Sequence, residues 1–157
     1  MTELPASARI VQDALAAAGS ASDIVVLPDS ARTAAEAAAA LECEVGAIAN
    51  SLVFMADGGP LLVMTSGAHR VDTAALARRV GKAQIVRATA DEVRSATGQA
   101  IGGVAPVGHP ARLETLIDVA LAAYEQIWAA GGTPHAIFAT TYPELVRMTR
   151  GTPVEVY

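Results

Sequence analysis

The sequence is poor in the residues that build disulfide frameworks, zinc sites and base-stacking surfaces. One cysteine, Cys43, stands among 157 residues, and aromatic residues make up 4%. A single cysteine cannot form an internal disulfide, and with three scattered histidines it gives no zinc-ligand spacing. We therefore expect a reducing intracellular compartment, no metal and no cofactor. So few aromatic side chains also argue against a surface that stacks on bases, so Trp128 and Tyr124 are interpreted as packing residues.

Long apolar runs are lacking as well. No stretch approaches the roughly 18–20 apolar residues of a membrane span. The first residues, Met1 to Pro5, have neither the basic region nor the apolar stretch of a signal peptide. The chain length predicts one domain over residues 1–157, and a hydrophobic fraction of 52% is enough to form a core. A cytoplasmic globular domain without a membrane partner is expected.

Positive charge is scarce overall but locally concentrated. The net charge of −5 argues against a general nucleic-acid binder. Residues 70–94, however, carry six cations against three acids, whereas residues 1–69 carry two cations against eight acids. This basic segment is either a solvated helix face or a surface that meets a phosphate backbone, and both interpretations stay open.

Hydrophobic spacing and capping signals predict the order of the elements. Three capping boxes begin at Thr33, Thr89 and Thr141. Helices are expected at 6–18, 34–41, 74–80, 90–96 and from 142 to near 151, and strands at 24–27, 48–56, 61–65, 83–86, 114–117 and 154–157. The segment 119–130 is ambiguous. Its residues favour a helix by propensity, yet the glycine pair at 131–132 followed by 136–139 resembles a hairpin turn and its second arm.

A stretch rich in glycine and proline, residues 97–110, interrupts this pattern. It reads TGQAIGGVAPVGHP and holds four of the thirteen glycines and two of the eight prolines. Glycine lets a ligand approach the backbone, and proline removes a donor and stiffens the chain. Such a loop is either a plain connector or a set of fixed backbone N–H groups suited to an oxyanion or carbonyl oxygen.

Five segments, in this order, resemble the YbaK family, which is related to the editing domain of prolyl-tRNA synthetase. They span about residues 30–150 and consist of Arg32-Thr33-Ala34-Ala35-Glu36-Ala37-Ala38, Ile48-Ala49-Asn50-Ser51-Leu52-Val53-Phe54, Ser66-Gly67-Ala68-His69-Arg70-Val71-Asp72, Thr97-Gly98 with Gly102 to Gly108, and Pro143-Glu144-Leu145-Val146-Arg147-Met148-Thr149. The resemblance implies a single α+β domain with a mixed, barrel-like β-sheet flanked by helices. It also implies strands on both sides of Gly131-Gly132.

The implied activity is hydrolysis of the ester that joins a wrong amino acid to the 3′-terminal adenosine of tRNA. The family's glycine-x-x-x-proline loop matches Gly102, Gly103, Val104, Ala105 and Pro106, whose implied catalytic role is to present backbone N–H groups to the substrate carbonyl. Water, oriented by the backbone and the substrate's own ribose hydroxyl, is the expected nucleophile. No spacing supports a triad built on Ser51 with a histidine.

The sequence departs from the family at Asn50, where the family usually has a lysine that helps to hold the substrate and its terminal phosphate. An asparagine amide donates hydrogen bonds but carries no charge. Three consequences are open: Arg70 or another cation takes over the role of the lysine, the site accepts a different ester, or the site is inactive. The candidate substrate-binding residues are Asn50, Ser51, Gly67, His69, Arg70, Gly108 and His109. Of the histidines, His109 adjoins the loop and is the candidate proton shuttle or ribose contact.

Three functions follow from this pattern. The first is a free-standing trans-editing deacylase that acts on a small amino acid, with tRNA-Pro as a candidate tRNA and an aminoacyl-tRNA synthetase as a candidate partner. The second is a non-catalytic module that binds an aminoacyl or nucleotide group. The third is a small-molecule esterase. The basic segment favours the first, whereas Asn50 and the overall acidity favour the other two.

Overall fold

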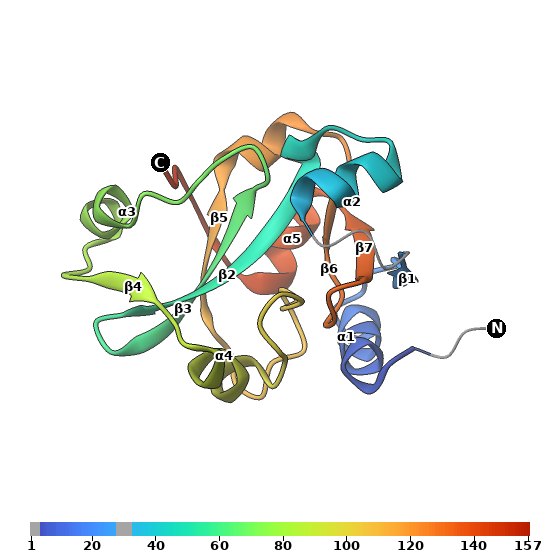
Figure 1. The fold of residues 1–157 in the computed structure, drawn as a ribbon, viewed down its shortest axis with the longest axis horizontal. Coiled ribbons are helices and arrows are strands. Elements are labelled where there is room, and N and C mark those ends of the chain that lie inside the picture. The colour runs from blue at the N-terminus through green and yellow to red at the C-terminus, as the bar shows by residue number, and fades with distance from the viewer. Residues whose placement is uncertain (1–3, 28–32) are drawn as a thin grey trace.

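A long antiparallel hairpin forms the centre of the fold (Figure 1). In this computed structural model, which describes residues 4–27 and 33–157, β2 (Ile48–Ala56) pairs with β3 (Gly59–Ser66) from Ala49 opposite Ser66 to Ala56 opposite Gly59. Asp57 and Gly58 at the turn have φ angles of 50° and 85°. Positive φ at both central residues is typical of the tight turns that match the twist of a hairpin. The hairpin predicted from the sequence is confirmed.

The remaining strands extend this hairpin into one mixed sheet. The strand order among the described residues is β1-β7-β6-β2-β3-β5-β8, and β4 pairs with β2 outside this path. The pairs β2–β6, β3–β5 and β5–β8 are parallel, whereas the other pairs are antiparallel. The bounds are β1 (Val25–Val26), β4 (Ile85–Arg87), β5 (Glu114–Asp118), β6 (Ile127–Ala130), β7 (Ala136–Thr140) and β8 (Thr152–Val154).

The helices begin where the capping signals place them. The side chains of Thr33, Thr89 and Thr141 each accept a hydrogen bond from the backbone N–H three residues later, as N-cap residues do. Asp72 caps its helix in the same way. The described helices are α1 (Ala6–Ala17), α2 (Ala34–Leu41), α3 (Thr73–Val80), α4 (Ala90–Thr97) and α5 (Tyr142–Thr149). In Figure 1, α2 and α4 lie near opposite ends of β2, and α5 lies behind the sheet.

The ambiguous segment 119–130 does not form an α-helix. It contains a short 3-10 helix, η2 (Val119–Ala123), followed by β6, which pairs with β7 across Gly131-Gly132. Ile127 and Ala129 are buried in the main core, with 0% and 2% exposure. Strand pairing and burial therefore override helix propensity here, as tertiary context often does. The hairpin implied by the family resemblance is confirmed.

Other predicted bounds shift only slightly. The C-terminal strand predicted at 154–157 lies earlier, at Thr152–Val154, because its pairing with β5 matches Leu116 with Thr152. Pro28-Asp29 and Arg32, which belonged to the predicted pattern, lie outside the described residues. The α+β class with a mixed sheet is confirmed. Among the described residues, the helices are too short or too polar to cross a bilayer.

Candidate functional site

The candidate site lies where one edge of β2 has no strand beside it. On the side away from β3, β6 pairs with Ile48 and Ala49, and β4 pairs with Phe54 to Ala56. Within the described part of the chain, residues 50–53 have no strand partner on this side. Backbone groups alternate in direction along a strand. Because Val53 accepts a hydrogen bond from Ala88 N–H on this side, the N–H and C=O of Ser51 also face the gap.

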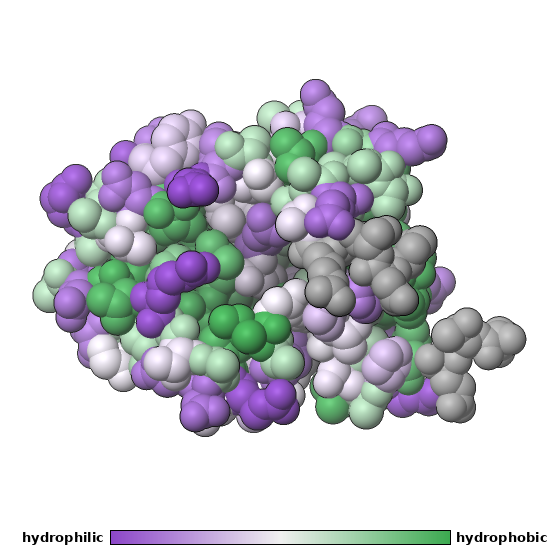
Figure 2. Space-filling model, in the orientation of Figure 1, coloured by the Kyte–Doolittle hydropathy of each residue, from purple (hydrophilic) through white to green (hydrophobic). Residues whose placement is uncertain are grey.

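A cavity of about 400 Å³ fills this gap. Its walls come from β2, α2, β4, β6, the start of β7 and the loop that follows α4, and Figure 2 shows a recess near the middle of this face. Ala49, Ala129 and Ala136 contribute small apolar side chains to the lining, and Trp128 contributes an aromatic one. Polar side chains are few: Thr33, Asn50, Ser51 and Arg87. Among the described lining residues there is no carboxylate, histidine or cysteine.

The loop of residues 102–106 contributes one wall of this cavity. Gly102 and Val104 line it. Gly102 has φ +97°, a backbone conformation that residues with a side chain rarely adopt. Gly103 packs so closely on the β6–β7 turn that an added Cβ would overlap the backbone of Thr133 and Pro134. The two glycines therefore have different roles: Gly102 permits the turn of the loop, and Gly103 permits its contact with the neighbouring turn.

The hydrogen bonds of the loop determine which amides are left for a ligand. Gly103 N–H points to Ala100 O at 3.4 Å, and Ala105 N–H donates to Gln99 Oε1 at 2.7 Å. Pro106 has no N–H. Within residues 4–27 and 33–157, the N–H groups of Gly102 and Val104 have no protein acceptor. Because both residues line the cavity, these two N–H groups are the backbone donors of the loop that remain as candidates for contact with a carbonyl or oxyanion.

The structure brings Asn50 and Ser51 to this cavity together with Gly102 and Val104. Asn50 is half-buried on β2 opposite Thr65. Ser51 Oγ lies 3.1 Å from the sulfur of buried Met64, the residue opposite it on β3. The Ser51 hydroxyl has no histidine beside it among the cavity residues, so the geometry does not build a serine–histidine pair. Residues 103, 105 and 106 lie in the same loop and are buried.

Gly67, His69 and Arg70 lie elsewhere, beyond the C-terminal end of β3. Nδ1 of His69 lies 2.9 Å from Oδ2 of Asp118, a fully buried carboxylate that also accepts from Ser66 N–H. Gly67 lies so close to Val45 O and Ala34 that a Cβ there would displace them. The absence of a side chain at Gly67 therefore permits close packing at the start of α2, a helix that contributes Ala34 and Ala37 to the cavity wall. None of Gly67, His69 and Arg70 lines the cavity.

Gly108 and His109 lie on the opposite side of the loop, toward α1. Gly108 has φ +86°, and a Cβ added to it would be in van der Waals contact with Ile10 and Val11 of α1. Nε2 of His109 lies 2.7 Å from the carbonyl oxygen of Ala105. Burial lowers the pKa of His109 below its ordinary value of 6.5, although the hydrogen bond to Ala105 opposes this shift. Because its Nε2 contacts the Ala105 carbonyl and His109 does not line the cavity, the imidazole lies behind the loop.

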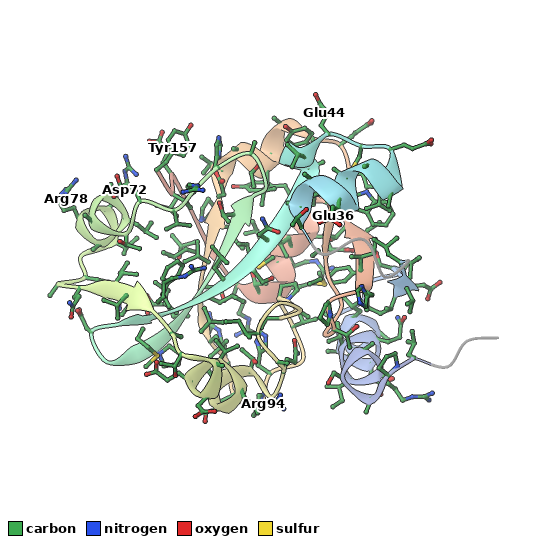
Figure 3. All side chains as sticks on the ribbon, viewed as in Figure 1. Glu36, Glu44, Asp72, Arg78, Arg94 and Tyr157 are labelled. Atoms are coloured by element: carbon green, nitrogen blue, oxygen red, sulfur yellow. The ribbon has the colours of Figure 1, made fainter. Side chains whose placement is uncertain are left out.

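The sequence did not single out Arg87, which the structure places at the cavity wall. Arg87 is exposed on β4, opposite Phe54 of β2. The other arginines of the basic segment are spread over several elements. Figure 3 shows Arg78 beyond α3 and Arg94 below α4, at different edges of the same face. The enrichment of cations at 70–94 was the available signal, but only the pairing of β4 with β2 shows which cation reaches the site.

The surroundings of Cys43 disfavour its ionisation. Burial and, to a smaller extent, the neighbouring charge of Glu44 raise the pKa of the Cys43 thiol above 9.0. A thiol that is harder to ionise is a poor nucleophile. Among the described residues, no three side chains of His, Cys, Asp or Glu come together as a metal site would require.

Comparisons with known proteins point to one family. The sequence profile of the aminoacyl-tRNA editing domain matches residues 28–148. The uncharacterized protein YwhH of Bacillus subtilis (strain 168) is 29% identical over 125 residues, covering 78% of each chain.

Two solved structures superpose over almost the whole chain. One is described provisionally as a trans-editing enzyme for prolyl tRNA synthetase; it has a TM-score of 0.91 at 45% identity, with 98% of each chain covered. The other, from work on epitope backbone grafting onto scaffold proteins, has a TM-score of 0.92 at 42% identity and the same coverage. Because the profile match spans most of the sequence, this chain belongs to the aminoacyl-tRNA editing domain family.

Proposed function

We propose that this protein is a free-standing trans-editing deacylase that hydrolyses the ester of a small amino acid mischarged on tRNA, with tRNA-Pro the first tRNA to test. The observation that carries this proposal is that Gly102 and Val104, whose N–H groups have no acceptor among the described residues, line the same cavity as residues 50–53 at the unpaired edge of β2. A substrate carbonyl bound between them receives two donors at once.

The chemistry needs no side-chain nucleophile. Water adds to the ester carbonyl, and the negative charge that develops on the carbonyl oxygen is stabilised by the two loop amides. The carbon–oxygen bond to the ribose then breaks. The proton that the water loses is returned to the ribose oxygen, with the neighbouring ribose hydroxyl as the group in reach of both. The products are the free amino acid and the 3′-terminal adenosine of tRNA.

The shape and charge of the cavity support a small aminoacyl group and a phosphate. Ala49, Ala129 and Ala136 leave space without polar groups for a short side chain. The C=O of Ser51, which faces the gap, is an acceptor for the α-ammonium group of the substrate. Arg87 supplies the positive charge that Asn50 does not, at the wall where the terminal nucleotide would leave the cavity.

Deacylation of a panel of mischarged tRNAs tests the proposal. Purified protein is incubated with Ala-, Ser- and Cys-charged tRNA-Pro, with correctly charged Pro-tRNA-Pro as control, and release of the amino acid is measured. We expect release above the buffer rate for at least one small amino acid, with Pro-tRNA-Pro spared. If none is hydrolysed while a small aminoacyl ester is cleaved, the protein is an esterase.

A binding module is the second candidate, and Asn50 is the observation that favours it. Without the family's usual lysine, the site retains the loop amides but has less charge with which to hold the substrate. If no ester is cleaved but a non-hydrolysable aminoacyl-adenosine amide binds, the binding function replaces the catalytic one.

A further inference from the structure

The loop of residues 102–106 is held from behind by a buried glutamine. The Gln99 side chain is 3% exposed. Its Oε1 accepts from Ala105 N–H at 2.7 Å, and its Nε2 donates to Val107 O at 3.4 Å. Gln99 is itself fixed to the end of α4, because its N–H donates to Thr97 Oγ1 at 3.0 Å and that hydroxyl donates to Val93 O at 2.7 Å. A chain of hydrogen bonds therefore links the C-terminal end of α4 to the loop.

His109 holds the other polar group of the same residue. Its Nε2 lies 2.7 Å from Ala105 O, and since a carbonyl oxygen only accepts, this nitrogen carries the proton. Ala105 has 0% exposure. Its N–H belongs to the peptide plane between residues 104 and 105, and its C=O belongs to the plane between 105 and 106. Two consecutive peptide planes are thus fixed by side chains that lie outside the cavity.

The adjacent peptide plane carries the N–H of Val104, one of the two amides available to a substrate. A peptide plane rotates about the bonds that join it to its neighbours, so fixing the planes that follow it restricts its orientation. Gln99 also accepts a hydrogen bond from the Ala105 N–H. Without this acceptor, the N–H would be an unsatisfied buried donor, or it would compete with the Val104 N–H for the substrate carbonyl. Pro106 adds a fixed φ at the end of the loop.

We propose that Gln99 and His109 are positioning residues for the ester hydrolysis: they hold both polar groups of Ala105 so that Val104 N–H stays directed at the substrate carbonyl. This inference rests on the proposed function. It gives His109 a role different from that of a proton shuttle. Neither side chain touches the substrate; each acts through the loop backbone. A displacement of about 1 Å at a reacting centre costs on the order of 100-fold in rate.

Steady-state deacylation separates this role from a merely structural one. Gln99→Met keeps the side-chain length but removes both hydrogen bonds, and we expect kcat to fall about 10- to 100-fold while KM changes less than about threefold. His109→Leu is expected to lower kcat in the same way. His109→Gln retains an Nε2 donor and should restore most of the loss, which is the result that a positioning role requires.

Thr149→Val is the matched control. The Thr149 hydroxyl donates to Leu145 O at 2.8 Å and accepts from Gly151 N–H at 3.0 Å, at the end of α5, away from the cavity. This variant should lose a comparable amount of thermal stability and keep its kcat. If Gln99→Met and Thr149→Val lower kcat equally, or if Gln99→Met keeps kcat within twofold of the native enzyme, the inference is overturned. A native protein with no deacylase activity overturns the proposed function instead.

Discussion

Replacing Gly102 by alanine tests the oxyanion role of the loop with a single methyl group. The φ angle of Gly102 is +97°, beyond the left-handed region near +50 to +70° that other residues tolerate. An added Cβ meets no atom within 4 Å, so the substitution introduces no clash. Its effect is therefore backbone strain. The strain is relieved only if the loop rotates, which would turn the Gly102 N–H away from the substrate carbonyl.

The size of the two effects distinguishes them. An L-residue in left-handed conformation costs roughly 1–2 kcal/mol, and each kcal/mol lowers the Tm of a domain of this size by about 2–4 °C. Loss of one oxyanion donor costs about 2.7–4 kcal/mol in the transition state, or about 100- to 1000-fold in kcat. If the loop rotates to relieve the strain, the stability loss is small, whereas the catalytic loss is large.

Gly58→Ala is the matched control for this experiment. Gly58 has φ +85° and no atom within 4 Å of an added Cβ, but it lies at the tip of the β2–β3 hairpin. Both variants should melt a few degrees below the native protein, and only Gly102→Ala should lose kcat in the deacylation assay. Full kcat in a Gly102→Ala protein whose Tm has fallen would refute the assignment of this amide as a donor.

Three further predictions concern charge. Arg87→Gln should raise KM for the tRNA substrate about fivefold, the ~1 kcal/mol of a charge pair at 4 Å in water, and this effect should shrink at high salt, whereas Arg78→Gln, outside the cavity, should leave KM unchanged. Asn50→Lys should lower KM by a similar factor, and an unchanged KM would show that charge at this position does not limit binding. His109 should make stability depend on pH: its folded-state pKa lies below 6.5, so the unfolded chain takes up the proton first and stability is lost as the pH falls from 6.5 toward the folded-state pKa. The pH dependence of Tm between about pH 7.5 and 5 should be shallower in His109→Gln, and equal slopes would contradict this assignment.

Much of the fold was predictable because its signals are local. The threonines at 33, 89 and 141 cap helices with the N–H group three residues on, so residue type and spacing alone identified these helix starts. The hairpin of β2 and β3 followed from its turn residues. Segment 127–130 was different, because its strand conformation depends on partners far along the chain. Ile127 pairs with Thr140, and Ala129 pairs with both Phe138 and Ala49.

The same distinction applies to the candidate site. The family resemblance linked Asn50 and Gly102, and the structure places both at one cavity. Gln99 carries no comparable signal, because a glutamine in a glycine-rich stretch has no periodic pattern that indicates burial. Its importance rests on the distance from its side chain to Ala105 N–H, a contact within a loop whose conformation the sequence does not specify.

Arg87 gives the site a positive charge although Asn50 stands where the family resemblance implies a lysine. The cavity exists because β6 ends its pairing with β2 at Ala49 and β4 begins its own at Phe54. The strand that closes the far end of this gap, β4, carries Arg87 at the residue opposite Phe54, so the pairing that creates the gap also places a cation at its wall. Charge and loop amides thus come from separate elements. Substituting Arg87 should therefore change how tightly tRNA binds, and substituting Gly102 should change how fast the bound ester is cleaved.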